Sequence, residues 1–178
     1  MILIKFFAII FFNLIDKFIH QKKILKFLKR NLNNLDIFID VGSHKGTYTD
    51  LILKNYKVKK IFMFEPQKNI FHFIKHKYKN TKKIKLFNTA ASNKEGVKNI
   101  YINQHDLTSS LTKLNKKNSY LNYKAFLFGS TMDKMISKVR KIKTVKLKDI
   151  IKKNSFKKID LIKIDTEGHE LQVILGIG

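Results

Sequence analysis

The segment from Ile37 to Thr47 constrains the fold more than any other part of the chain. Its apolar run ends in Asp40, and Gly42 and Gly46 then form a turn that leads into residues with helical character. A strand, a glycine turn and a helix in this order form the first unit of a doubly wound α/β domain, which binds nucleotide-like ligands beyond the carboxyl ends of its strands. We therefore expect a parallel sheet with a binding site at this turn.

Strands and helices alternate through the rest of the chain. The expected strands comprise residues 37–41, 60–64, 84–88, 97–102, 145–147 and 161–164. The expected helices comprise residues 46–55, a segment after Pro66 and residues 167–175, and residues 104–140 are expected to be polar and irregular. This alternation predicts an α/β fold in which helices cover both faces of a doubly wound, mostly parallel sheet. Because such sheets have about six or seven strands, we expect residues 35–178 to be a C-terminally truncated domain that lacks its last strands.

Residues 1–34 are expected to form an N-terminal helical extension. Lys5 and Asn13 are the only polar positions in the apolar run that opens the chain, and this run is shorter than the roughly 20 apolar residues that span a bilayer. Apolar residues then recur at helical spacing up to Leu32 with lysines between them, which predicts helices over residues 2–33. Two roles stay open for residues 1–33: they lie on an anionic membrane surface, or they pack onto the domain.

The chain is strongly basic, with a formal net charge of +24 from 37 lysines and arginines against 13 acids. Such an excess can attract RNA, an anionic membrane or an acidic glycan. The lysines are scattered, however, and Arg30 and Arg140 are the only arginines, so we attribute the charge to a general preference for lysine and expect no nucleic-acid partner. The absence of cysteine excludes disulfides and suits a reducing, cytoplasmic location.

The turn after residue 41 limits the kind of ligand. A dinucleotide requires glycine two positions after Gly42, and this chain has His44 there. Backbone N–H groups at the start of the following helix still suit a carboxylate. S-adenosylmethionine carries a carboxylate, an ammonium group and a ribose but no phosphate, so Asp40 would meet its ammonium group, directly or through water. Glu65, which ends the next apolar run, would accept hydrogen bonds from the ribose hydroxyls. The simpler alternatives are a helix-capping Asp40 and an exposed strand-end Glu65.

Six short motifs follow one another along the chain. They are Ile39–Gly42, Phe64–Pro66, Asn88–Gly96, Ser109–Leu111, Val145–Asp149 and Lys163–Glu170. This ordered set resembles the FkbM family of S-adenosylmethionine-dependent methyltransferases over about Phe38 to Gly176, and the last motif is the most specific. The resemblance implies a Rossmann-like class I fold and O-methylation of a sugar or another hydroxylated metabolite. The chain departs from the family at Asn93 and Lys148, where an acid is usual.

These considerations assign candidate site residues. The expected cofactor-binding residues are Asp40, Gly42, Ser43, Gly46, Glu65, Asn88 and Ala91. Asp165 ends the strand expected beside the first one, so we expect it to act as the base or to orient the acceptor. The second choices for catalysis are Glu167, His169 and Glu170. Ser109 and Ser110 are expected in a loop that covers the acceptor.

Two further expectations concern charged side chains outside this set. Lys163 lies in an apolar run, so we expect it to be buried and paired with Asp165, Glu167 or Glu170. No metal site is expected, because His72 and His76 have helical spacing but no acid beside them, which favours a solvated helix face.

Two other functions remain as alternatives to methylation of a small molecule or glycan. An RNA methyltransferase would use the positive charge directly. An inactive fragment bound to a membrane surface would need only the N-terminal extension.

Overall fold

The computed structural model describes residues 19–103, 109–111 and 136–178. Its centre is a four-stranded parallel sheet in the order β3-β2-β1-β7. The strands are β1 (Ile37–Val41), β2 (Lys60–Phe64), β3 (Ile84–Phe87) and β7 (Leu161–Ile164). The chain builds outward from β1 to β3 and then returns to the other side of β1, so a topological switch point lies between β1 and β7. The expected α/β fold with a mainly parallel sheet is confirmed.

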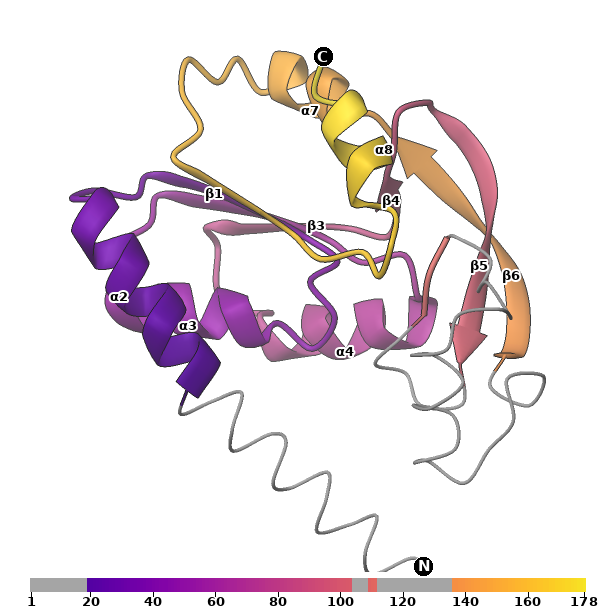
Figure 1. Ribbon diagram of the computed structural model, residues 1–178, viewed down its shortest axis with the longest axis horizontal. Coiled ribbons are helices and arrows are strands. Elements are labelled where there is room, and N and C mark those ends of the chain that lie inside the picture. Colours follow the sequence, from indigo (N-terminus) through magenta and orange to yellow (C-terminus); the bar gives the residue numbers. More distant parts are fainter. Residues whose placement is uncertain (1–18, 104–108, 112–135) are drawn as a thin grey trace, which may run out of the picture.

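Helices cover both faces of this sheet (Figure 1). One face carries α2 (Gln21–Asn31), α3 (Thr47–Asn55) and α4 (Lys68–Lys77), and the other carries α7 (Leu147–Lys153) and α8 (Glu170–Leu175). Successive strand residues point to opposite faces, so Phe38 packs with the α2–α4 cluster and Ile39 with the α7–α8 cluster. Because both faces are buried, the central strands are continuous apolar runs, and this is why the sequence located them.

A second sheet lies beside the first, with strand order β4-β6-β5. Its strands are β4 (Ala90–Ala91), β5 (Gly96–Asn103) and β6 (Ile136–Val145). The antiparallel β5–β6 ribbon confirms the expected strand at 97–102 but corrects two expectations. Residues 136–140 are strand rather than irregular, and Leu147 begins helix α7 rather than ending a strand. Exposed lysines and Arg140 occupy half of the positions from residue 138 to the end of β6, so the strand lacks the apolar alternation that would have identified it.

The N-terminal extension is helical where the structure describes it. Helix α2 confirms that part of the expectation, while residues 1–18 lie outside the described residues. Its Leu28 is buried in the α2–α4 cluster, with Ile24 and Leu32 packed against that cluster. No helix within residues 19–103, 109–111 and 136–178 has the length and apolar character to cross a bilayer.

Helix α8 begins three residues later than expected. Glu167 and Gly168 have φ angles of 53° and 96°, so they form a left-handed turn instead of the first turn of the helix. The Glu170 carboxylate accepts hydrogen bonds from the backbone N–H groups of Thr166, at 2.8 Å, and Gly168, at 3.0 Å. Glu170 therefore fixes the turn that joins β7 to α8.

Candidate functional site

Two glycines shape the turn after β1. Gly42 and Gly46 have φ angles of 70° and 78°, in the left-handed region that residues other than glycine rarely adopt. A Cβ atom at Gly42 would overlap the backbone carbonyl of Asp165, and one at Gly46 would overlap the hydroxyl of Tyr78. Both positions therefore need glycine for two independent reasons, and the turn lies directly against the end of β7.

The backbone amides of this turn donate their hydrogen bonds inside the protein. The N–H groups of Gly42 and Ser43 both donate to the carbonyl of Phe64, each at 3.1 Å, and that of Gly46 donates to Ser43 at 2.8 Å. These three amides therefore hold the turn to the end of β2. The expected contact between a ligand carboxylate and the backbone N–H groups at the start of α3 (Thr47–Asn55) stays a prediction.

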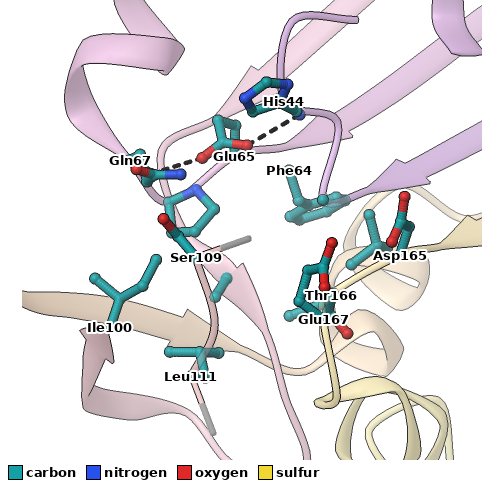
Figure 2. Close-up of a pocket in the computed structure, with 15 residues that line it drawn as sticks. His44, Phe64, Glu65, Gln67, Ile100, Ser109, Leu111, Asp165, Thr166 and Glu167 are labelled. Atoms are coloured by element: carbon teal, nitrogen blue, oxygen red, sulfur yellow. Dashed lines mark hydrogen bonds between the residues drawn. The ribbon is translucent and has the colours of Figure 1, made fainter. Parts of the chain in front are cut away.

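A pocket opens beyond the carboxyl ends of β1, β2 and β7 (Figure 2). Its walls come from five parts of the chain: the turn after β1, the segment after β2, the β4–β5 region, residues 109–111 and the segment after β7. Glu65 and Gln67 lie on one side, and Asp165, Thr166 and Glu167 lie on the other. The pocket is thus at the switch point where a doubly wound sheet binds its ligand.

Glu65 is buried in the wall of this pocket and is 3% exposed. Its Oε2 accepts a hydrogen bond from the His44 N–H at 3.0 Å, and its Oε1 accepts one from the Gln67 N–H at 2.8 Å (Figure 2). Burial raises the pKa of Glu65 to about 7, although both amides and the nearby Lys163 favour the charged form. Each carboxylate oxygen has a second lone pair, so Glu65 can accept hydrogen bonds from a ligand as well.

Asp40 lies behind the pocket rather than in it. It is 0% exposed, and strand alternation places it on the α3 side of the sheet, opposite the pocket-lining Val41. Its Oδ2 accepts a hydrogen bond from the Thr49 hydroxyl at 2.8 Å, and its Oδ1 lies 3.2 Å from the Lys163 ammonium. Burial raises the pKa of Asp40, and Lys163 opposes that rise. Asp40 is not among the residues that line the pocket, and its expected contact with a ligand ammonium group, directly or through water, stays a prediction.

Lys163 links β1, the turn after it and the end of β7. Its ammonium group donates to the carbonyl of Gly42 at 2.7 Å, pairs with Asp40 and lies 3.7 Å from the Asp165 carboxylate. The group also lies 5.2 Å from the centre of the Tyr48 ring. Asp165 was among its expected partners, but Asp40 and the Gly42 carbonyl were missed. The signal for Asp40 is the pairing of β1 with β7, which places Lys163 directly beside it.

Asp165 lies where the topology predicted. Strand β7 is parallel to β1, and the Asp165 N–H donates to the carbonyl of Val41 at 3.1 Å. The side chain is 58% exposed, and both Asp165 and Glu167 line the pocket. The Asp165 side chain can therefore contact a molecule in the pocket while it remains partly exposed to solvent.

The other two candidates for catalysis support the backbone. His169 is buried, and its Nε2 lies 3.0 Å from the Ser92 hydroxyl. Burial and the neighbouring Lys98 lower the pKa of His169, which favours the neutral ring. Glu170 holds the turn at residues 166–168 as described above. Neither His169 nor Glu170 is among the described residues that line the pocket.

The remaining candidates for cofactor binding divide in the same way. Gly42 and Ala91 line the pocket, whereas Ser43, Gly46 and Asn88 hold its walls. The Asn88 side chain donates to the backbone carbonyl of Glu65 at 2.9 Å. These contacts fix the segment after β2 without reaching the pocket.

Sequence reasoning missed Gln67. It is buried in the pocket wall, and its Oε1 has no hydrogen-bond partner among the described residues. A buried acceptor of this kind is suited to a ligand donor. Its position two residues after Glu65 was the available signal. Of the two expected loop residues, Ser109 lines the pocket and Ser110 donates to the Glu167 carbonyl at 2.6 Å.

The pocket is acidic although the chain is basic. Glu65, Asp165 and Glu167 line it, and no lysine or arginine occurs among its described lining residues. In a chain with net charge +24, this arrangement favours a cationic ligand. Within the part of the chain that the structure describes, no three acidic or histidine side chains gather as a metal-binding group.

Comparison with known proteins gives the family. The model of the methyltransferase FkbM domain matches residues 40–178. No curated protein matches the chain. The crystal structure of methyltransferase FkbM from Methylobacillus flagellatus KT is similar with a TM-score of 0.49 and 15% identity, over 80% of this chain and 28% of that one. The chain therefore spans less than a third of the length of that protein. Because the family model matches most of its residues, the chain belongs to the FkbM methyltransferase family.

Proposed function

We propose that this chain binds S-adenosylmethionine in the pocket beyond β1, β2 and β7 and transfers a methyl group to a hydroxyl of a sugar or another hydroxylated metabolite. The observation that carries the proposal is the acidic pocket of a basic chain, with Glu65 on one wall and Asp165 on the other. When bound, S-adenosylmethionine supplies an electrophilic methyl group on a positively charged sulfur. Membership of the FkbM methyltransferase family supports this choice of reaction.

The residues around Glu65 fit the uncharged end of this cofactor. Besides the two backbone amides, the Glu65 oxygens can accept hydrogen bonds from the two adjacent hydroxyls of a ribose. Gln67 adds a buried acceptor oxygen to the same wall. The backbone bonds from His44 and Gln67 hold the Glu65 carboxylate in one orientation, so little ordering is needed when a ligand binds.

The residues after β7 fit the reacting end. Asp165 and Glu167 place negative charge where a sulfonium and an acceptor hydroxyl would meet. Methyl transfer requires an acceptor oxygen held in line with the breaking bond, about 3 Å from the methyl carbon. Asp165 would orient that hydroxyl and accept its proton, and Lys163 would hold the Asp165 carboxylate from behind.

Calorimetry on the full chain tests the cofactor assignment. We expect S-adenosylmethionine to bind, and Glu65→Gln to weaken binding by about 1–3 kcal/mol because two charge-assisted hydrogen bonds become neutral ones. Glu95→Gln is the matched control, since Glu95 is exposed and does not line the pocket. Equal affinities for the wild type and Glu65→Gln would refute the ribose assignment. A folded chain that does not bind the cofactor would refute the proposed function itself.

A further inference from the structure

Helix α2 has two different sides. Its buried side is anchored by Leu28, which belongs to the α2–α4 core cluster. The opposite side consists of exposed residues spaced three and four positions apart: Ile19, Lys23, Lys26, Phe27 and Arg30. Residues at this spacing lie on one side of a helix. We call this set the outer face of α2.

The outer face is cationic, and no acid neutralises it within residues 19–35. Lys23, Lys26 and Arg30 form no ion pair with any residue in the described ranges, and residues 19–35 contain no acid. The first acid after the helix, Asp36, is paired with Lys59. The positive charge of the face is thus available to an anionic partner.

The same face exposes large apolar side chains. Phe27 is 65% exposed and Ile19, in the turn before α2, is 47% exposed. A single exposed phenylalanine is ordinary in a soluble protein. Apolar side chains surrounded only by cations are instead the combination that binds an anionic bilayer, where the rings enter the headgroup region and the ammonium groups meet lipid phosphates.

We propose that the outer face of α2 docks on the surface of an anionic lipid membrane. A nucleic acid is the other polyanion to consider, but an aliphatic side chain such as Ile19 offers no stacking surface to a base, and the face contains only one arginine. The buried side of α2 holds the helix on the domain, so docking places the whole domain at the membrane without a spanning segment.

Vesicle sedimentation of the full chain tests the charged part of the face. Vesicles of phosphatidylcholine with phosphatidylglycerol should bind the wild type, and vesicles of phosphatidylcholine alone should bind it much less. The triple variant K23Q/K26Q/R30Q should lose about 100-fold in affinity, at roughly fivefold per cation. The matched control K138Q/R140Q/K141Q removes the same charge from exposed positions on β6, at the opposite end of the molecule in Figure 1. The control should lose less than tenfold.

A second pair of variants tests the apolar part. Phe27→Ser should weaken vesicle binding severalfold, whereas Phe73→Ser on α4, where the ring is 52% exposed, should leave it unchanged. All these positions are exposed, so circular dichroism should show an unaltered fold.

Three outcomes would overturn the proposal. The first is an equal loss in the two triple variants, which would mean a general attraction by net charge. The second is full vesicle binding by K23Q/K26Q/R30Q. The third is a loss of polyuridylate binding by K23Q/K26Q/R30Q with unchanged vesicle binding, which would assign the face to RNA.

Discussion

Two buried carboxylates at the ends of neighbouring strands differ in what neutralises them. Asp40 faces α3 and is held by Thr49 and Lys163, so its partners are side chains inside the protein. Glu65 borders the pocket, accepts hydrogen bonds from two backbone amides, and its pKa rises to about 7. Burial raises the pKa of both carboxylates, but Asp40 is enclosed by the fold, whereas Glu65 lies where a ligand can reach it. Strand alternation does not separate them, because Glu65 comes two residues after Met63, the register partner of Asp40. The difference is that Asp40 lies within β1, whereas Glu65 lies just beyond the end of β2, where the pocket opens.

The largest effect is expected at Asp165, which lies across the pocket from Glu65. Asp165→Asn keeps the shape of the side chain and removes its charge. We expect methyl transfer to fall by about 10²–10⁴-fold, the usual range for loss of a general base, with cofactor affinity changed far less. Single-turnover assays with a methylatable acceptor and calorimetry measure the two quantities. Full turnover in Asp165→Asn would remove Asp165 from the chemistry, and a fall in cofactor affinity alone would make it a cofactor ligand.

The buried pair offers the next largest effect. Lys163→Met leaves Asp40 without its cation, and breaking a buried pair in this way typically costs about 3–5 kcal/mol of folding stability. Urea unfolding measures the loss. Lys85→Met, at an exposed position on β3, should cost far less. The double variant Asp40→Asn/Lys163→Met should recover part of the loss. If its loss of unfolding free energy equals the sum of the losses in the two single variants, the two side chains do not interact.

Glu65 should make stability depend on pH in the opposite sense to an ordinary paired acid. Its pKa is about 7 in the folded chain and near 4.5 when exposed, so the folded state binds more protons between these values. Stability contributed by this group therefore falls as pH rises from about 4.5 to 7, by at most about 1.4 kcal/mol per pH unit. Unfolding of the wild type and Glu65→Gln at pH 5 and pH 8 measures it. The wild type should lose stability relative to the variant as pH rises, and parallel curves would contradict the shifted pKa.

The smallest effect concerns ligand affinity. If the Glu65 carboxylate accepts ribose hydroxyls, binding favours its ionised form and lowers its pKa. Affinity for S-adenosylmethionine should then rise up to about tenfold between pH 6 and pH 8 in the wild type. Glu65→Gln should show a flatter profile in the same calorimetric titration. If affinity depends on pH in the same way in both proteins, then ligand binding does not change the pKa of Glu65.

The sequence predicted those parts of the fold that burial enforces. Strands β1 and β2 are apolar because helices cover both of their faces, and the switch-point rule then placed Asp165 beside Gly42. Strand β6 was largely missed because its exposed lysines and Arg140 carry no burial signal. The sequence placed Asp40 beside the turn but could not show that its side chain would be fully buried and outside the pocket lining.

Within the site, the residues that line the pocket and those that support it could not be separated from the sequence. His169 and Glu170 share a motif with Asp165, but their contacts lie with Ser92 and with the turn at residues 166–168. Gln67 was missed because an amide has no charge pattern to mark it. Its importance appears only when its buried oxygen is found without a partner among the described residues.

The contact between Gly42 and the carbonyl of Asp165 has a consequence for the movement of the site. No side chain separates the two backbones, so the turn that would hold the methyl donor and the segment that would hold the acceptor meet main chain to main chain. This backbone contact has no side-chain rotamers that could change. Lys163 strengthens it by donating a hydrogen bond to the Gly42 carbonyl. On the proposed function, the scaffold would set the separation between donor and acceptor, and an acceptor would have to fit a gap of fixed width.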